Sequence, residues 1–211
     1  MHLDHVSYAA EPDGLRASAE RLGKALGVTP VDGGNHPRFG TRNVVLPMKG
    51  GHYVEVVEAL EHPAADKCPF GQAVRARSTD GGGWLGWVVA VDDIAPVEER
   101  LGRESVRGNR HRPDGVELRW RQIGVKGLMS DPQLPFVVCW ETPELHPSRD
   151  GDTEVSLTEL SIAGDPERVR EWLGQGVDDE PRTVGFTFVA PHGTPGLMAV
   201  TFDTPIGPVQ I

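Results

Sequence analysis

Glu55 is the residue whose surroundings point most directly to chemistry. It lies in the middle of the apolar run Tyr53-Val54-Glu55-Val56-Val57, which is typical of a buried strand. Burying a carboxylate there is costly unless the carboxylate is paired or exposed. The side chain could pair with an arginine across the sheet. Alternatively, its apolar neighbours favour a carboxylate that takes up a proton near neutral pH, which is the property of a general base.

A second group of polar residues lies just before this strand, in the segment 33–43. The glycines there allow the backbone to approach a ligand closely. The side chains of His36, Arg38 and Asn43 could donate hydrogen bonds to a carboxylate, phosphate or carbonyl oxygen. The alternative is a surface loop in which these polar residues cap turns.

The second half of the chain offers cationic and aromatic candidates. The run Glu117-Leu118-Arg119-Trp120-Arg121 alternates, so Arg119 and Arg121 share one face of a strand. If that face lines a cleft, the two guanidinium groups form a binding wall for an anionic small molecule. Otherwise it is the solvent-facing side of an antiparallel sheet. Trp140 ends another apolar run and is a candidate to stack on a ligand.

Composition limits the class of protein. The chain has 211 residues and a formal net charge of -10, which argues against a nucleic-acid partner. Cys68 and Cys139 have neither the spacing of a zinc ribbon nor that of a redox pair, so we expect free thiols of a reducing compartment. No leader sequence or long apolar run is evident, so we expect a soluble, cytoplasmic protein without a membrane partner.

The elements that must position these residues recur along the chain as a strand, a helix and further strands. Residues 1–62 predict a strand over 3–9, a helix over 15–26, strands over 42–46 and 53–60, and a weaker strand at 29–31. Residues 63–148 predict a linker and a second such unit, with strands over 84–91, 116–123 and 136–140 and a short helix over 94–101.

The remaining residues, 149–211, predict a third unit of the same kind or part of one. Its expected strands lie at 155–160, 183–189, 197–202 and 207–211, and its helix starts after the N-cap Asp165. The pattern as a whole predicts an α+β protein built from repeated modules.

Four short motifs resemble those of one family. They are Leu3-Asp4-His5-Val6, the segment 34–43, the strand around Glu55, and the run 134–140 with His146-Pro147. In this order they resemble the glyoxalase-like branch of the vicinal oxygen chelate superfamily, over about residues 3 to 147. The third unit resembles it only in its pattern of elements.

The resemblance implies a fold and a site. It implies paired βαβββ modules whose curved mixed sheets enclose a cleft, with the helices outside. It also implies a divalent metal held by the first and last strands of each module, and it places His5 and Glu55 at the first module's ligand positions. The implied chemistry is that of an isomerase, lyase or dioxygenase acting on a small molecule.

The second module departs from this pattern. Alignment puts Gly86 at its first ligand position and Cys139 near the other. A set of His5, Glu55 and Cys139 could hold Zn, Mn, Fe or Ni, but a soft thiolate beside a hard carboxylate is an unusual combination, so a metal-free site is favoured.

Two functions therefore remain open. One is an enzyme in which Glu55 moves a proton or helps to hold a metal. The other is a metal-free protein that binds a metabolite or antibiotic without catalysis. No hydrolase elbow, phosphate loop or dinucleotide fingerprint is present. We also expect a homodimer, and the third unit packs either beside the main pair of modules or against its equivalent in the second chain.

Overall fold

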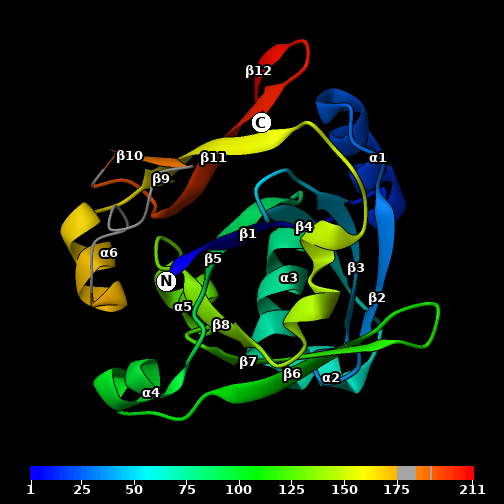
Figure 1. The fold of residues 1–211 in the computed structure, drawn as a ribbon. Coiled ribbons are helices and arrows are strands. Elements are labelled where there is room, and N and C mark those ends of the chain that lie inside the picture. The colour runs from blue at the N-terminus through cyan, green and yellow to red at the C-terminus, as the bar shows by residue number, and fades with distance from the viewer. Residues whose placement is uncertain (175–183, 191) are drawn as a thin grey trace.

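The computed structural model describes residues 1–174, 184–190 and 192–211. Its centre is a closed eight-stranded barrel (Figure 1). In order around the barrel, the strands are β1 (His2–Ala9), β4 (Tyr53–Ala59), β3 (Thr41–Pro47), β2 (Val31–His36), β6 (Val106–His111), β7 (Glu117–Ile123), β8 (Phe136–Trp140) and β5 (Gly83–Ala90).

The barrel consists of two equivalent modules. In the first, β1 is followed by helix α1 (Leu15–Leu26) and pairs in parallel with β4; in the second, β5 is followed by α4 (Ala95–Leu101) and pairs in parallel with β8. The modules meet along a long antiparallel β1–β5 ladder and, on the other side, through the single pair Asn35 and His111. This confirms the α+β fold of repeated βαβββ modules.

Several segments differ from the prediction because tertiary pairing decides them. Strand β2 extends to His36, into residues predicted as a loop, and β6 was not predicted because its sequence, VRGNRH, is mostly polar. The linker contains helices α2 (Pro63–Lys67) and α3 (Pro69–Thr79). Helix α5 (Gly127–Ser130) and the 3-10 turns η1 (Pro143–Leu145) and η2 (Pro147–Arg149) complete this part of the chain.

The C-terminal unit does not repeat the strand order of the modules. It comprises β9 (Ser156–Ala163), α6 (Pro166–Leu173), β10 (Gly185–Val189), β11 (Gly196–Thr204) and β12 (Gly207–Gln210), arranged β10-β9-β11-β12. The strand that follows α6, β10, pairs directly with β9. In the barrel modules, the strands that follow α1 and α4 are β2 and β6, which lie at the far edge of their module. The predicted strand start at Thr183 lies outside the described residues.

This C-terminal sheet packs against the outer face of the barrel (Figure 1). Trp84 stacks on Phe202, Trp87 packs on Phe186, and the indole of Trp84 donates a hydrogen bond to the carbonyl of Ile211. Its contact with the barrel is therefore made within one chain.

Strand alternation divides the apolar residues of the barrel into two clusters. The outer cluster joins the barrel wall to α1 and the C-terminal unit. The inner cluster includes Val88, Trp120 and Phe136 from the strands and Phe70 and Val74 from α3. Helix α3 therefore packs on the inner cluster, whereas α1 packs on the outer one. Among the described residues, no helix is long and apolar enough to cross a bilayer.

Candidate functional site

A cavity of about 30 Å³ lies inside the barrel and is lined by residues of both modules. A buried water needs about 10–15 Å³ of such space, so the cavity has room for the reacting part of a small molecule. Its lining is His5, His36, Phe39, Asn43, Tyr53, Glu55, Phe70, Arg110, Trp120, Gln122, Phe136, Val138 and Trp140.

Glu55 is held in a fixed orientation in this cavity. Its Oε1 accepts a hydrogen bond from Asn43 Nδ2 at 2.9 Å, and its Oε2 accepts one from Ser7 Oγ at 3.0 Å. The Nε2 atoms of His5 and His36 lie 3.9 Å from Oε2 and Oε1, respectively. In the described part of the chain no arginine forms an ion pair with Glu55, so the predicted cross-sheet arginine partner is not found.

His36 is a neutral neighbour of this carboxylate. Burial lowers its pKa to about 4, an effect that Glu55 opposes and Arg110 reinforces. A hydrogen bond of 2.9 Å between its Nδ1 and Thr41 Oγ1 fixes the ring. At neutral pH, His36 therefore carries no charge, and its Nε2 faces the carboxylate of Glu55.

Asp4 fixes the second imidazole. Its carboxylate accepts hydrogen bonds from His5 Nδ1 at 2.6 Å, from Trp140 Nε1 at 2.8 Å and from His146 Nε2 at 3.2 Å. Burial alone would raise the pKa of Asp4, but the hydrogen bonds from His146 and His5 bring it well below its usual range. Because an ionised carboxylate only accepts, His5 Nδ1 carries a proton, and its Nε2 faces Glu55.

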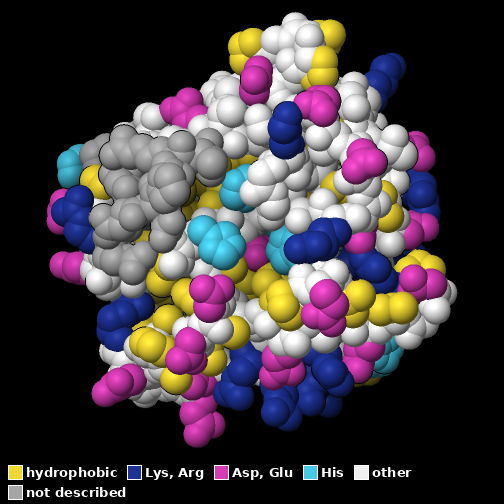
Figure 2. Space-filling view, viewed as in Figure 1, with side chains coloured by type: hydrophobic (Ala, Val, Ile, Leu, Met, Phe, Trp, Pro, Cys, Tyr) yellow, Lys and Arg dark blue, Asp and Glu magenta, His cyan; other side chains and the backbone are white. Residues whose placement is uncertain are grey.

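Histidines are also prominent on the surface, where several gather near the centre of the face in Figure 2.

Trp140, which was predicted to stack on a ligand, does line the cavity, although its indole N–H already donates a hydrogen bond to Asp4.

The predicted metal ligands do not form a complete set. Cys139 lies apart from His5 and Glu55, and its Sγ contacts the backbone oxygen of Asp92 at 3.5 Å. Within the described ranges, no group of three His, Cys, Asp or Glu side chains is arranged to hold an ion. A catalytic metal normally keeps about three protein ligands, so the residues present do not fit the implied metal, and we derive no step through one.

Strand register explains why the second module contributes no ligands. His5 and Ser7 pair with Tyr53 and Glu55, whereas Val88 and Ala90 pair with Phe136 and Val138. The register is compatible with two equivalent pairs, Gly86 with Phe136 and Val88 with Val138, and none of these four residues carries a metal-binding side chain. The cavity-lining residues of β8 are Phe136, Val138 and Trp140, so alternation puts Cys139, which was predicted near a ligand position, on the opposite face of its strand.

The cation in the cavity is not one of those predicted. Trp120 points inward, so Arg119 and Arg121 point outward; Arg119 is exposed, and Arg121 pairs with Glu98 at 3.1 Å. This corrects their predicted role as the binding wall. The interior guanidinium is that of Arg110 on β6, whose strand gave no clear signal in the sequence.

A wider groove of about 270 Å³ adjoins the cavity and shares Phe39 and Gln122 with it. Two cationic side chains, those of Arg103 and Lys126, line this groove. A molecule longer than the cavity could extend into the groove past these shared residues.

Comparisons with known proteins agree with this architecture. Residues 3–177 match the family described as glyoxalase-like domain. A hypothetical protein from Staphylococcus aureus is similar in fold, with a TM-score of 0.63 and 12% identity over 99% of this chain and 84% of that chain. Methylmalonyl-CoA epimerase from Mycobacterium tuberculosis gives a TM-score of 0.46 and 16% identity over 66% of this chain and 86% of that chain. Among curated proteins, none matches this sequence.

Proposed function

The chain belongs to the glyoxalase-like domain family, and on that premise we propose that it is an enzyme that moves a proton on a small molecule held in the barrel cavity. The observation that carries this proposal is the placement of Glu55. A buried carboxylate is fixed by two neutral donors, Ser7 and Asn43, and faces an imidazole nitrogen on each side.

This arrangement suits proton abstraction next to a carbonyl group. Glu55 would take the proton from a Cα–H bond, and the electron pair of that bond would move onto the carbonyl oxygen to give an enolate. The amide of Gln122 borders the same cavity; its oxygen accepts a hydrogen bond from Trp120 Nε1 at 2.7 Å, which leaves the amide NH2 as a donor for the enolate oxygen. Return of the proton to carbon completes an isomerisation or an exchange with solvent.

The Nε2 atoms of His5 and His36 extend this chemistry. Each lies 3.9 Å from an oxygen of Glu55, so a modest movement would bring either within hydrogen-bonding distance. His5 is held by Asp4 with its Nε2 directed at Glu55. These rings would take the proton from Glu55 and return the base to its ionised form.

The test is solvent exchange followed by proton NMR. Pyruvate, 2-oxobutyrate and acetoacetate are incubated in D2O with wild-type protein, with Glu55→Gln and with a control, Glu58→Gln, whose carboxylate lies on the same strand but pairs with Arg42. We expect the wild type and the control to accelerate exchange of Cα protons in at least one compound. Loss of a general base predicts a fall of about 10²-fold or more in Glu55→Gln.

Two results would overturn the proposal. One is equal exchange with Glu55→Gln and the wild type. The other is no acceleration of exchange by the wild type for any compound that binds to it, which would support the alternative of a metal-free binding protein. The apolar second-module positions, Val88 and Val138, are the observation that favours this alternative.

A further inference from the structure

Arg110 is a buried cation that the fold leaves incompletely paired. It lies on β6, has 2% of its surface exposed, and lines the same cavity as Glu55. Burying a guanidinium group is costly unless its N–H groups are satisfied. An arginine in this position is therefore expected to have a partner.

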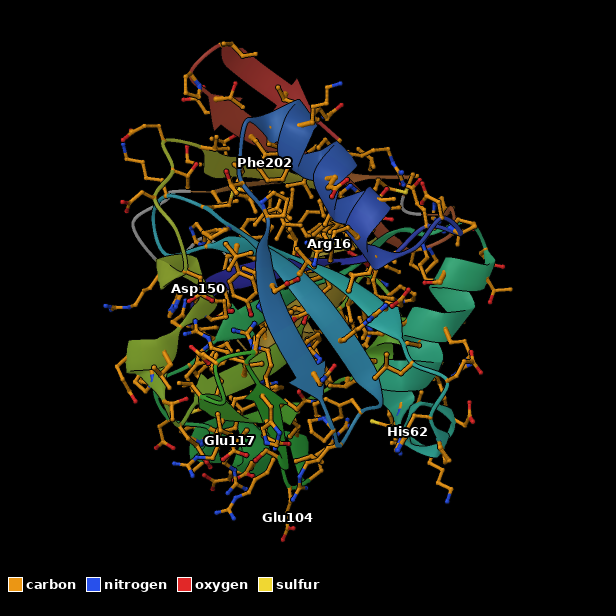
Figure 3. All side chains as sticks on the ribbon, turned by 90° about the vertical axis from the view of Figure 1, so that its right-hand side faces the viewer. Arg16, His62, Glu104, Glu117, Asp150 and Phe202 are labelled. Carbon is orange, nitrogen blue, oxygen red and sulfur yellow. The ribbon has the colours of Figure 1, made fainter. Side chains whose placement is uncertain are left out.

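Among the described residues, one edge of the Arg110 guanidinium group has no hydrogen-bond partner. Its Nε and Nη2 atoms have no hydrogen-bond partner among the described residues. Asp150 Oδ2 lies 3.6 Å from Nη2, outside hydrogen-bonding distance, and the same carboxylate is in close contact with Arg112. Asp150 lies at one side of the barrel, on the segment that follows β8 (Figure 3).

The two free atoms form one side of the guanidinium fork. Nε–H and one N–H of Nη2 point in parallel along that edge, which is the geometry that matches the two oxygens of a carboxylate. A lysine could not make this paired contact. The free donors therefore select for the shape of an anion as well as for its charge.

The residues around Arg110 leave room for its guanidinium group. A Cβ atom on Gly33 would lie 3.1 Å from Arg110 Nη1 and 2.0 Å from Asn43 Oδ1, so a side chain at position 33 would displace both. Asn43 in turn donates to Glu55. Glycine at position 33 thus lets the cation and the carboxylate base share one small enclosure.

From this geometry we infer that the Nε–Nη2 edge of Arg110 binds the carboxylate group of the substrate, so that the substrate is a small carboxylic acid. The inferred role in catalysis rests on the proposed function of Glu55, but the binding itself does not. With its carboxylate on Arg110, the acid would have its neighbouring carbon in the cavity that Glu55 faces.

Binding can be tested with two matched pairs of probes, pyruvate with pyruvamide and propionate with propionamide. Each pair keeps nearly the same shape while the charge and one oxygen are lost. We expect calorimetry or ligand-observed NMR to show that the wild type binds at least one acid tenfold or more tightly than its amide. Arg110→Met should lose this selectivity, Arg110→Lys should weaken it, and the exposed control Arg119→Met should retain it.

The same titrations separate this inference from the proposed function. Glu55→Gln should bind the acids at least as tightly as the wild type, because it removes a negative charge from the cavity while losing exchange activity. Equal affinity of the wild type for acids and amides would overturn the inference, as would wild-type selectivity in folded Arg110→Met. Because the comparison of acid with amide uses wild-type protein, it stands even if a variant fails to fold.

Discussion

Gly33→Ala is the substitution that most sharply tests how the cavity is held together. The added Cβ atom would lie 2.0 Å from Asn43 Oδ1, so the Asn43 side chain must move by about 1 Å or more to regain normal contact. That movement breaks the 2.9 Å hydrogen bond from Asn43 to Glu55. Gly33 does not have a positive φ, so the effect is steric and not a result of backbone strain.

The magnitude follows from the hydrogen bond that is lost. A hydrogen bond to a charged group contributes about 1.5–3 kcal/mol, so we expect the free energy of unfolding to fall by about 2 kcal/mol. For a chain of this size that corresponds to a decrease in Tm of about 4–8 °C. Without the bond from Asn43, Glu55 is no longer held in place, and a misplacement of the base by about 1 Å should slow Cα exchange by about 10²-fold.

The assays are thermal unfolding and the NMR exchange measurement on the same samples. Gly185→Ala is the matched control, because this strand glycine also lacks a positive φ and its Cβ would come no closer than 3.6 Å to another atom of the described residues. The reasoning is refuted if Gly33→Ala keeps both the Tm and the exchange rate of the wild type. Equal decreases of Tm and exchange rate in Gly33→Ala and Gly185→Ala would also contradict it.

Three further predictions concern charge. The pKa of His36 is about 4 in the folded protein, below its ordinary 6.5, so the unfolded state takes up a proton first and the free energy of unfolding falls by about 3 kcal/mol between pH 6.5 and pH 4. Denaturant titrations should therefore show a weaker dependence of stability on pH in His36→Gln than in the wild type. The same pH dependence in both proteins would count against this. Arg110→Met should have a Tm no lower than that of the wild type, because it removes an incompletely paired buried charge; a large decrease would show that Asp150 already satisfies it. Asp4→Asn should lower the free energy of unfolding at pH 7 by about 3 kcal/mol, since His5 and His146 lose hydrogen bonds to a charged acceptor, and urea unfolding with no such loss would disprove this.

The sequence predicted elements whose apolar pattern is regular. The helix over 15–26 was predicted at its observed bounds because its apolar stripe ends at Gly27, which adopts a left-handed φ of 72°. Strand β8 was also predicted at its observed bounds, from its continuous apolar run. In such elements the local pattern and the tertiary burial agree.

The part of the site that was missed depends on long-range pairing. Strand β6 has a polar sequence and is placed by its ladder with β7, so nothing local indicated that Arg110 would face the interior. The predicted ligand position near Cys139 was wrong because the face that a β8 residue presents to the cavity is decided by the pairing of β8 with β5 and β7 in the closed barrel. Alternation correctly put Arg119 and Arg121 on one face, but only the closed barrel shows that this face is the outer one.

The central claim is that one cavity brings a carboxylate base and a carboxylate-binding arginine to the same small substrate. A crystal structure of the protein soaked with pyruvate tests it most directly. The account predicts that the pyruvate carboxylate makes paired hydrogen bonds with Nε and Nη2 of Arg110, and that its methyl carbon lies about 3–3.5 Å from an oxygen of Glu55. Pyruvate bound on the outer face beside Arg119, or bound in the cavity with its carboxylate turned away from Arg110, would contradict it.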